Sequence, residues 1–279
     1  MNDLSRALTL LICLSVMVTA AEGEFWHGDF TGDSTRVFLP DAPLLETADP
    51  GSPVIARLPM GITAHVTSSA GDVILPDGTP SYMYEVSASC QGRDLQGYMP
   101  YTSLAMASLE LRSGLLFMFS VTAYDTSTAF WSGSMRIVDG NEIVASYDFR
   151  PPDGGFGQIP YSYCVRALPL DPGGLDQVQD LIQLSFIYEA CGFLNRDMLV
   201  VWTGDSMFQG PNADSQFEAG IYSYNENFVL PSDSGGMAGT VIVRGTLMEW
   251  DESIEDYTQS SSTDEIYVWD GTEFIPEQL

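Results

Sequence analysis

The sequence predicts an all-β protein, in which a small barrel is followed by a larger β-sandwich-like or irregular β-sheet domain. Three observations predict this fold class. Short apolar runs recur along the chain and are separated by Gly, Pro and Asp. In several runs apolar residues take alternate positions, which is typical of half-buried strands. Between residues 33 and 105, no apolar stripe has the spacing of a helix.

An apolar segment near the start of the chain predicts export. The segment 7–18 is interrupted only by Thr9 and Ser15, and the small residues Thr19, Ala20 and Ala21 follow it. This pattern is typical of a secretory signal peptide, and the run is shorter than the ~20 residues that span a bilayer. We therefore expect a cleaved signal peptide over 1–21, a linker over 22–32, and a periplasmic or extracellular mature protein with no transmembrane segment.

Residues 33–105 predict the small barrel. Turn signals occur at Pro40-Asp41, at Pro59-Met60-Gly61 and at Asp77-Gly78. They separate short apolar runs at 36–39, 54–58, 62–66, 82–86 and 97–99. Strands at this spacing, joined by tight turns, favour a small antiparallel barrel.

The same segment resembles the bacterial SH3-like (SH3b) domain. The matching residues are 52–58, the Leu58-Pro-Met-Gly61 turn, the strand 84–86, and the closing segments 97–99 and 101–104. Three features depart from the family pattern. Pro43-Leu-Leu-Glu46 replaces the usual Leu-Asn-Val-Arg-like stretch, Tyr98 replaces the customary Trp, and the hairpin 70–81 is longer than usual.

The resemblance implies a binding role. Domains of this family often accompany cell-wall hydrolases and hold peptidoglycan or peptide, although a fold alone does not carry a function. The ligand-binding candidates are aromatic residues of the barrel, namely Tyr82, Tyr84, Tyr98 and Tyr101. Packing of the small core is the alternative role for these side chains, and it is the one favoured.

Residues 106–279 predict a second β-rich domain. Its strand candidates are 115–124, 134–138, 142–144, 183–189, 198–202 and 240–248, and the segment 266–274 has the pattern of a hairpin. Hairpin signals lie at Asp139-Gly140 and Asp270-Gly271, where glycine accepts a positive φ. Met198–Trp202 is a continuous apolar run, which is typical of a strand buried on both faces.

Three cysteines remain after export, at positions 90, 164 and 191. Because exported proteins meet an oxidising environment, we expect a disulfide between Cys164 and Cys191 and a buried free thiol at Cys90. For Cys164 and Cys191, the alternative to a disulfide is a reactive thiol.

The charge excludes some partners. The chain has 38 acidic residues and 10 cations, all of them Arg, for a net charge of -28. Such an excess disfavours nucleic acid and anionic membrane surfaces, because phosphate binding needs clustered cations.

No catalytic constellation is predicted, and no metal or cofactor. The two histidines, His27 and His65, precede all three mature-chain cysteines, whereas in Cys–His peptidases the His usually follows the Cys. Paired carboxylates that hydrolyse a glycan are not excluded, since acids are abundant. The acidic run 249–256 suggests Ca²⁺ binding only weakly, because the D-x-[DN]-x-[DN]-G loop is missing.

The sequence therefore predicts an exported, non-catalytic binding protein of the cell envelope, with peptidoglycan or an envelope protein as its partner. Two alternatives remain open. One is a carboxylate-dependent glycan hydrolase that uses residues 106–279. The other is a structural or inhibitory interaction protein whose contact surface lies in the C-terminal sheet.

Overall fold

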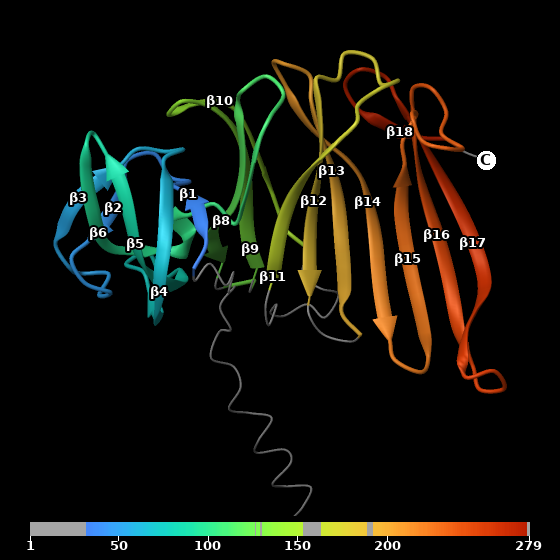
Figure 1. Ribbon diagram of the computed structural model, residues 1–279, viewed down its shortest axis with the longest axis horizontal. Coiled ribbons are helices and arrows are strands. Elements are labelled where there is room, and N and C mark those ends of the chain that lie inside the picture. The colour runs from blue at the N-terminus through green and yellow to red at the C-terminus, as the bar shows by residue number, and fades with distance from the viewer. Residues whose placement is uncertain (1–31, 126, 129, 153–162, 189–191, 278–279) are drawn as a thin grey trace, which may run out of the picture.

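The computed structural model describes residues 32–125, 127–128, 130–152, 163–188 and 192–277. These residues form three antiparallel sheets, which lie side by side along the longest axis of the molecule (Figure 1). The all-β fold class is confirmed. Among the described residues, no helix has the length and apolar character needed to cross a membrane.

The first sheet has six strands and curls into a half-barrel. Its strand order is β1 (Ser34–Arg36), β4 (Thr63–Ile74), β5 (Pro80–Cys90), β6 (Arg93–Pro100), β2 (Ala42–Leu45) and β3 (Val54–Leu58). After β6 the chain forms a short 3₁₀ helix, η1 (Tyr101–Ser103), and returns to β1, where Val37 forms a bridge with Leu104. This return places the following segment against the barrel.

The second sheet has four strands, in the order β10 (Glu142–Phe149), β9 (Phe130–Asp139), β8 (Leu116–Asp125) and β7 (Ala107–Glu110). The hairpin predicted at Asp139-Gly140 joins β9 to β10, with Asp139 opposite Glu142 and Gly140 at φ +59°. This sheet contacts the barrel through Arg136, whose guanidinium donates to the carbonyl of Phe38 at 2.8 Å and lies over its ring.

The third sheet has eight strands in sequential order. They are β11 (Tyr163–Leu170), β12 (Asp180–Tyr188), β13 (Leu194–Trp202), β14 (Met207–Glu218), β15 (Tyr222–Val229), β16 (Thr240–Asp251), β17 (Asp256–Trp269) and β18 (Phe274–Pro276). The predicted Asp270-Gly271 turn joins β17 to β18, and Trp269 lies opposite Phe274. Hairpin connections of this kind require no crossover, so the sheet grows strand by strand.

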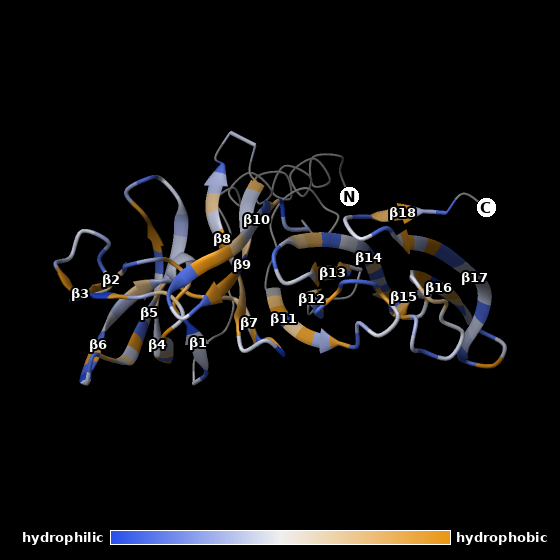
Figure 2. Ribbon diagram, turned by 90° about the horizontal axis from the view of Figure 1, so that it is seen from above, coloured by the Kyte–Doolittle hydropathy of each residue, from blue (hydrophilic) through white to orange (hydrophobic). Residues whose placement is uncertain are grey.

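The second and third sheets pack face to face. Phe119 of β8 meets Phe186 of β12 edge-on, with ring centroids 5.4 Å apart. In the view from above, apolar and polar segments alternate along β9 and β11, which belong to the two sheets (Figure 2). One cluster of buried residues continues from Leu44 in the barrel through Phe119 to Val200 in β13. The predicted boundary at residue 105 therefore lies between η1 and β7 in a chain whose buried core is continuous.

Strand β13 is buried on both faces, as its apolar run predicts. Val200 and Trp202 belong to the core shared with the four-stranded sheet. Leu199 and Val201 point to the opposite face and pack in a second cluster with Val241 and Trp269. The eight-stranded sheet therefore has a core on each side of its first strands.

Candidate functional site

A groove opens where the barrel meets the four-stranded sheet, and we call it the barrel groove. Its volume is about 450 Å³, within the ~300–1,000 Å³ usual for ligand sites. It is formed by β2, β3 and the turn between them, the β4–β5 turn, the end of β6, η1 and β8, together with the segment just before β2. The residues that line it are Leu39, Pro43, Leu45, Pro50, Ser52, Val54, Arg57, Leu75, Pro76, Asp77, Pro100, Thr102, Ser103 and Thr122.

Tight turns hold two walls of the barrel groove. In the β4–β5 turn, the amide of Leu75 donates to the carbonyl of Thr79, and Gly78 donates back to Leu75, both at 2.9 Å. In the β2–β3 turn, the Asp49 carboxylate accepts a hydrogen bond from the Gly51 amide at 2.8 Å. Four prolines add fixed φ angles to this lining. The groove is therefore largely preformed, which lowers the entropy cost of binding.

Two segments that depart from the SH3b sequence pattern contribute residues to this groove. They are the Pro43–Glu46 stretch and the long hairpin 70–81. Pro43 and Leu45 come from the Pro43–Glu46 stretch, and Leu75, Pro76 and Asp77 come from the long hairpin. The sequence marks these segments as unusual, but no local signal shows that they meet.

Arg57 places one cation at the barrel groove. The Nη1 atom of Arg57 donates to the carbonyl of Asp41 at 3.1 Å, and it lies 3.9 Å from the Asp41 carboxylate. Both side chains are more than half exposed, so this ion pair contributes little to stability. A guanidinium has five donors, and it suits carboxylate or carbonyl groups of a ligand.

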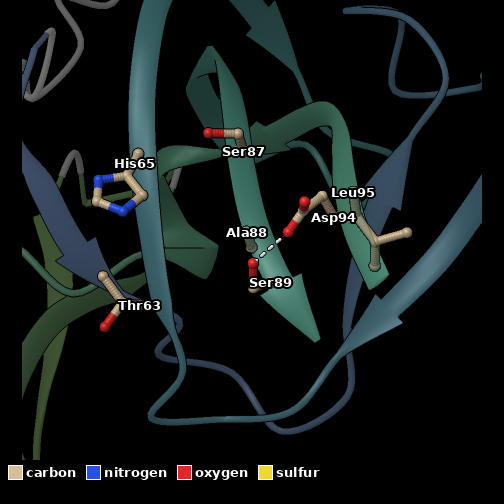
Figure 3. A pocket seen from close by; sticks show the side chains of 7 residues that line it. All are labelled: Thr63, His65, Ser87, Ala88, Ser89, Asp94 and Leu95. Atoms are coloured by element: carbon tan, nitrogen blue, oxygen red, sulfur yellow. Dashed lines mark hydrogen bonds between the residues drawn. The ribbon is translucent and has the colours of Figure 1, made fainter. Parts of the chain in front are cut away.

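A second hollow lies on the six-stranded barrel sheet, and polar and apolar surface line it in about equal measure (Figure 3). Its volume is about 480 Å³, and Thr63, His65, Ser87, Ala88, Ser89, Asp94 and Leu95 line it. Ser89 donates to the Asp94 carboxylate across the β5–β6 pair, and the dashed line in Figure 3 marks this bond. Hydroxyl and carboxylate groups of this kind bind water or polar ligands.

His65 has a hydrogen-bond partner that the sequence does not reveal. The register of β1 and β4 places Ser34 opposite His65, and the Ser34 Oγ and His65 Nδ1 atoms are 2.7 Å apart. Both residues are exposed. A hydrolytic triad also needs a carboxylate that orients the imidazole, whereas Asp94 of the same hollow accepts from Ser89.

The four predicted tyrosines are divided between the core and the partly exposed surface. Tyr84 and Tyr101 are 1% and 0% exposed, so these two side chains pack in the core, which is the alternative to ligand binding given above. Tyr82 and Tyr98 are partly buried, and the Tyr82 ring lies 5.4 Å from the Tyr84 ring. None of the four lines either hollow described above.

Two carboxyl groups of the eight-stranded sheet have contrasting surroundings. Burial raises the pKa of Asp197 on β13, and the nearby charge of Asp214 adds to that effect, while hydrogen bonds from Ser185 and Gln183 oppose it. Asp214 on β14 instead receives two hydrogen bonds of 2.6 Å from the guanidinium of Arg196. In the β13–β14 register, Asp197 lies opposite Ala213 and Asp214 lies opposite Arg196, so the two carboxyl groups project from opposite faces of the sheet and do not form a catalytic pair.

Within the described part of the chain, Cys90 and Cys164 form no disulfide, and both side chains are partly buried, so Cys90 is less buried than the sequence predicts. Cys164 lies opposite Ile187 in the β11–β12 pair, and Cys191 lies outside the described residues. The predicted Cys164–Cys191 disulfide therefore has no support, and it stays a prediction. In the described part of the chain, no group of three or more His, Cys, Asp or Glu side chains is arranged to hold a metal ion, and the acidic run 249–256 is included in that statement.

The similarity of residues 33–105 to SH3b domains rests on the sequence pattern and stays a prediction. No protein-family model matches the chain, and no curated protein is significantly similar to it.

Proposed function

We propose that the protein is an exported, non-catalytic binding protein of the cell envelope, and that its barrel groove holds an extended apolar peptide segment. The observation that carries this proposal is the groove itself, which combines a ligand-sized volume, an apolar and proline-rich lining, and a single guanidinium. The signal-peptide pattern supports export. The resemblance of the barrel to SH3b domains supports a peptide-bearing partner.

Such a segment has two sources in an envelope, the peptide stems of peptidoglycan and the chain of another envelope protein. Both offer short apolar side chains together with carboxylate or carbonyl groups. The side chains fit the lining at Leu45, Val54 and Leu75, and the oxygens suit Arg57.

The test is co-sedimentation of the chain lacking residues 1–21 with purified peptidoglycan sacculi. Val54→Asp places a charge in the groove, and Ile143→Asp on β10 is the matched control, because the two parent side chains are 47% and 44% exposed. If the groove binds wall peptide, the wild-type protein and the control pellet with sacculi and the Val54 variant stays in solution. Equal sedimentation of both variants contradicts the role of the groove.

A second arm separates the two sources. A photo-crosslinking residue at position 54, activated in cells, forms adducts with an envelope protein if that is the partner, and the same residue at position 143 is the control. Absence of both sacculus binding and position-54 adducts contradicts the proposal as a whole.

A carboxylate-dependent glycan hydrolase is the second candidate, and Asp197, whose pKa is raised by burial, is the carboxyl group suited to act as its general acid. This candidate predicts soluble glycan fragments after prolonged incubation of the protein with sacculi, and loss of those fragments in Asp197→Asn. Wild-type protein that releases no fragments rules this candidate out.

A further inference from the structure

Two hairpins of the eight-stranded sheet end together, far along the chain from the barrel. The β14–β15 and β16–β17 turns lie at the same end of the sheet (Figure 1). The amide of Trp250 donates to the carbonyl of Ile221 at 2.9 Å, and the amide of Gly220 donates to the Tyr257 hydroxyl at 2.8 Å. The Tyr257 ring lies 5.1 Å from Trp250 and 5.8 Å from Phe217. These contacts fix the two tips as one surface.

This surface is apolar and open to solvent. Phe217, Ile221 and Ile254 are 45%, 60% and 59% exposed. Trp250 and Tyr257 are partly buried between them. We call these five residues the hairpin-tip patch. Single exposed apolar residues are common, but a group that includes aromatic rings and large aliphatic side chains marks an interaction surface.

Acidic side chains lie at the same hairpin tips as the patch. Glu252 and Glu255 flank Ile254 in the β16–β17 turn, whereas Glu218, Glu249, Asp251 and Asp256 alternate with the aromatic patch residues along their strands and project from the other face of the sheet. Between residues 207 and 279 the sequence has one cation, Arg244, and the carboxylate of Asp264 pairs with it through two hydrogen bonds of 2.8 and 2.9 Å. The acids at these tips therefore lack a basic neighbour in this part of the sequence.

The β16–β17 tip has a defined conformation. The Asp251 carboxylate accepts from the amide and the hydroxyl of Ser253, at 2.8 and 2.6 Å, and these bonds lower the pKa of Asp251. Glu255 holds a positive φ of 53°, which is uncommon for a residue other than glycine. The patch and the acids of the tip are thus presented by an ordered turn, which reduces the entropy cost of binding.

We propose that the hairpin-tip patch docks a basic amphipathic segment of another protein, one that carries large apolar side chains next to Lys or Arg. The apolar side chains would cover Phe217, Ile221 and Ile254, and the cations would reach the carboxylates of the hairpin tips, first of all those in the β16–β17 turn. Charge complementarity favours this occupant over the others. A second copy of the chain would bring two acidic surfaces together, and an anionic membrane would repel them in the same way.

The test uses an array of immobilised twelve-residue peptides, in which the number of apolar residues and the number of Lys or Arg residues vary independently. The chain lacking residues 1–21 is the probe. The proposal predicts retention only on peptides that have both features, with binding that weakens as NaCl rises.

Three double variants separate the contributions. Ile221→Ser with Ile254→Ser removes apolar surface and is expected to weaken binding by at least ~10-fold. Glu252→Gln with Glu255→Gln is expected to reduce both the preference for cationic peptides and the salt dependence. Ile143→Ser with Val144→Ser on β10 is the control and should bind as the wild type does. Thermal melting of each variant establishes that it is folded.

Other outcomes overturn the proposal. It fails if the array shows no preference for cations, or if the Ile221 and Ile254 variant keeps wild-type retention. It also fails if the chain self-associates in sedimentation velocity and the Ile221 and Ile254 substitutions abolish that association. Binding to vesicles of phosphatidylglycerol and phosphatidylcholine that the same substitutions abolish would contradict it equally. The peptide array tests residues of the eight-stranded sheet, and sacculus co-sedimentation tests the barrel groove. Either proposal can therefore fail without the other.

Discussion

Gly97, on β6, lies against the backbone of β2. A Cβ atom there would be 2.5 Å from the carbonyl oxygen of Leu45 and 2.9 Å from the side chain of Leu44. A backbone oxygen can move only if its strand moves, so the extra carbon at position 97 would force β2 and β6 apart. Glycine at this position allows β6 and β2 to approach each other.

We therefore predict that Gly97→Ala lowers the free energy of unfolding by ~1–3 kcal/mol, the usual cost of overpacking. Urea denaturation measures the change. Gly51→Ala is the control, because its new Cβ would meet only the Asp49 side chain, at 3.4 Å, and its stability should be close to that of the wild type. Equal stability of the two variants would contradict the close approach.

A second prediction at the residue scale concerns Asp197, whose pKa is raised above the ordinary value of 3.8, first by burial. Between the ordinary and the raised value, the folded chain keeps a proton that the unfolded chain releases, so stability falls as pH rises through this window. Asp197→Asn does not titrate. Its melting temperature should therefore exceed that of the wild type at neutral pH, and the difference should shrink in acid.

Asp264 provides the opposite case and serves as its control. Hydrogen bonds from Arg244 lower the pKa of Asp264, so its contribution to stability is present above the unfolded value and is lost as pH falls. Asp264→Asn should therefore melt below the wild type at neutral pH, with a difference that disappears in acid. Parallel pH profiles for the two Asn variants would rule out this account.

At the scale of elements, the short strand β18 closes one core of the eight-stranded sheet. The ring centroids of Phe274 and Trp269 are 4.9 Å apart. Two carbons at the edge of the Phe274 ring would lie 3.1 and 3.2 Å from a Cβ atom added to Gly210 of β14. Phe274 is partly buried, whereas its neighbour Ile275 is 46% exposed. The strand therefore acts through one side chain, which covers β14 from the far end of the sheet.

We predict that Phe274→Ala destabilises the protein by ~1–3 kcal/mol, below the ~3–5 kcal/mol typical of a fully buried Phe. Removal of this ring also exposes Trp269, so the tryptophan fluorescence should shift to the red. Ile275→Ala should change the denaturation midpoint little. A red shift of the same size in both variants would show that β18 as a whole, rather than Phe274, covers the core.

Elements were predicted well where their signals are local. The Asp139-Gly140 and Asp270-Gly271 turns are hairpins because glycine adopts a positive φ whatever the rest of the chain does. The apolar run at 198–202 is buried on both faces as predicted. The contribution of Phe274 to the core was not predictable, because its ring packs beside Gly210 of β14, which is distant in the sequence.

For the molecule as a whole, charge is the dominant property. Residues 106–279 carry 26 acids and six Arg, whereas residues 30–105 carry eight acids and three Arg. Like charges repel across the folded protein, and added salt shortens the Debye length from ~10 Å at 0.1 M to ~3 Å at 1 M. Screening should therefore stabilise the folded state more than it does in a protein of balanced charge.

The prediction is a melting temperature that rises between low and molar NaCl. The triple variant Glu252→Gln, Glu255→Gln and Asp256→Asn removes three exposed charges, so it should melt higher than the wild type at low salt and respond less to added salt. A wild-type melting temperature that stays level or falls with NaCl would contradict self-repulsion as a main determinant of stability.

The sequence by itself determined the all-β class, the two glycine hairpins and the acidic excess, because each depends on composition or on neighbours in the chain. It did not reveal the candidate sites. Pro43, Leu75 and Thr122 meet in one groove, Ser34 lies beside His65, and Ile221 lies against Trp250. These pairs are separated by about thirty or more residues, and they meet only through strand register and sheet packing. Only the tertiary structure decided them, because contact between distant residues leaves no periodic or local mark in the sequence.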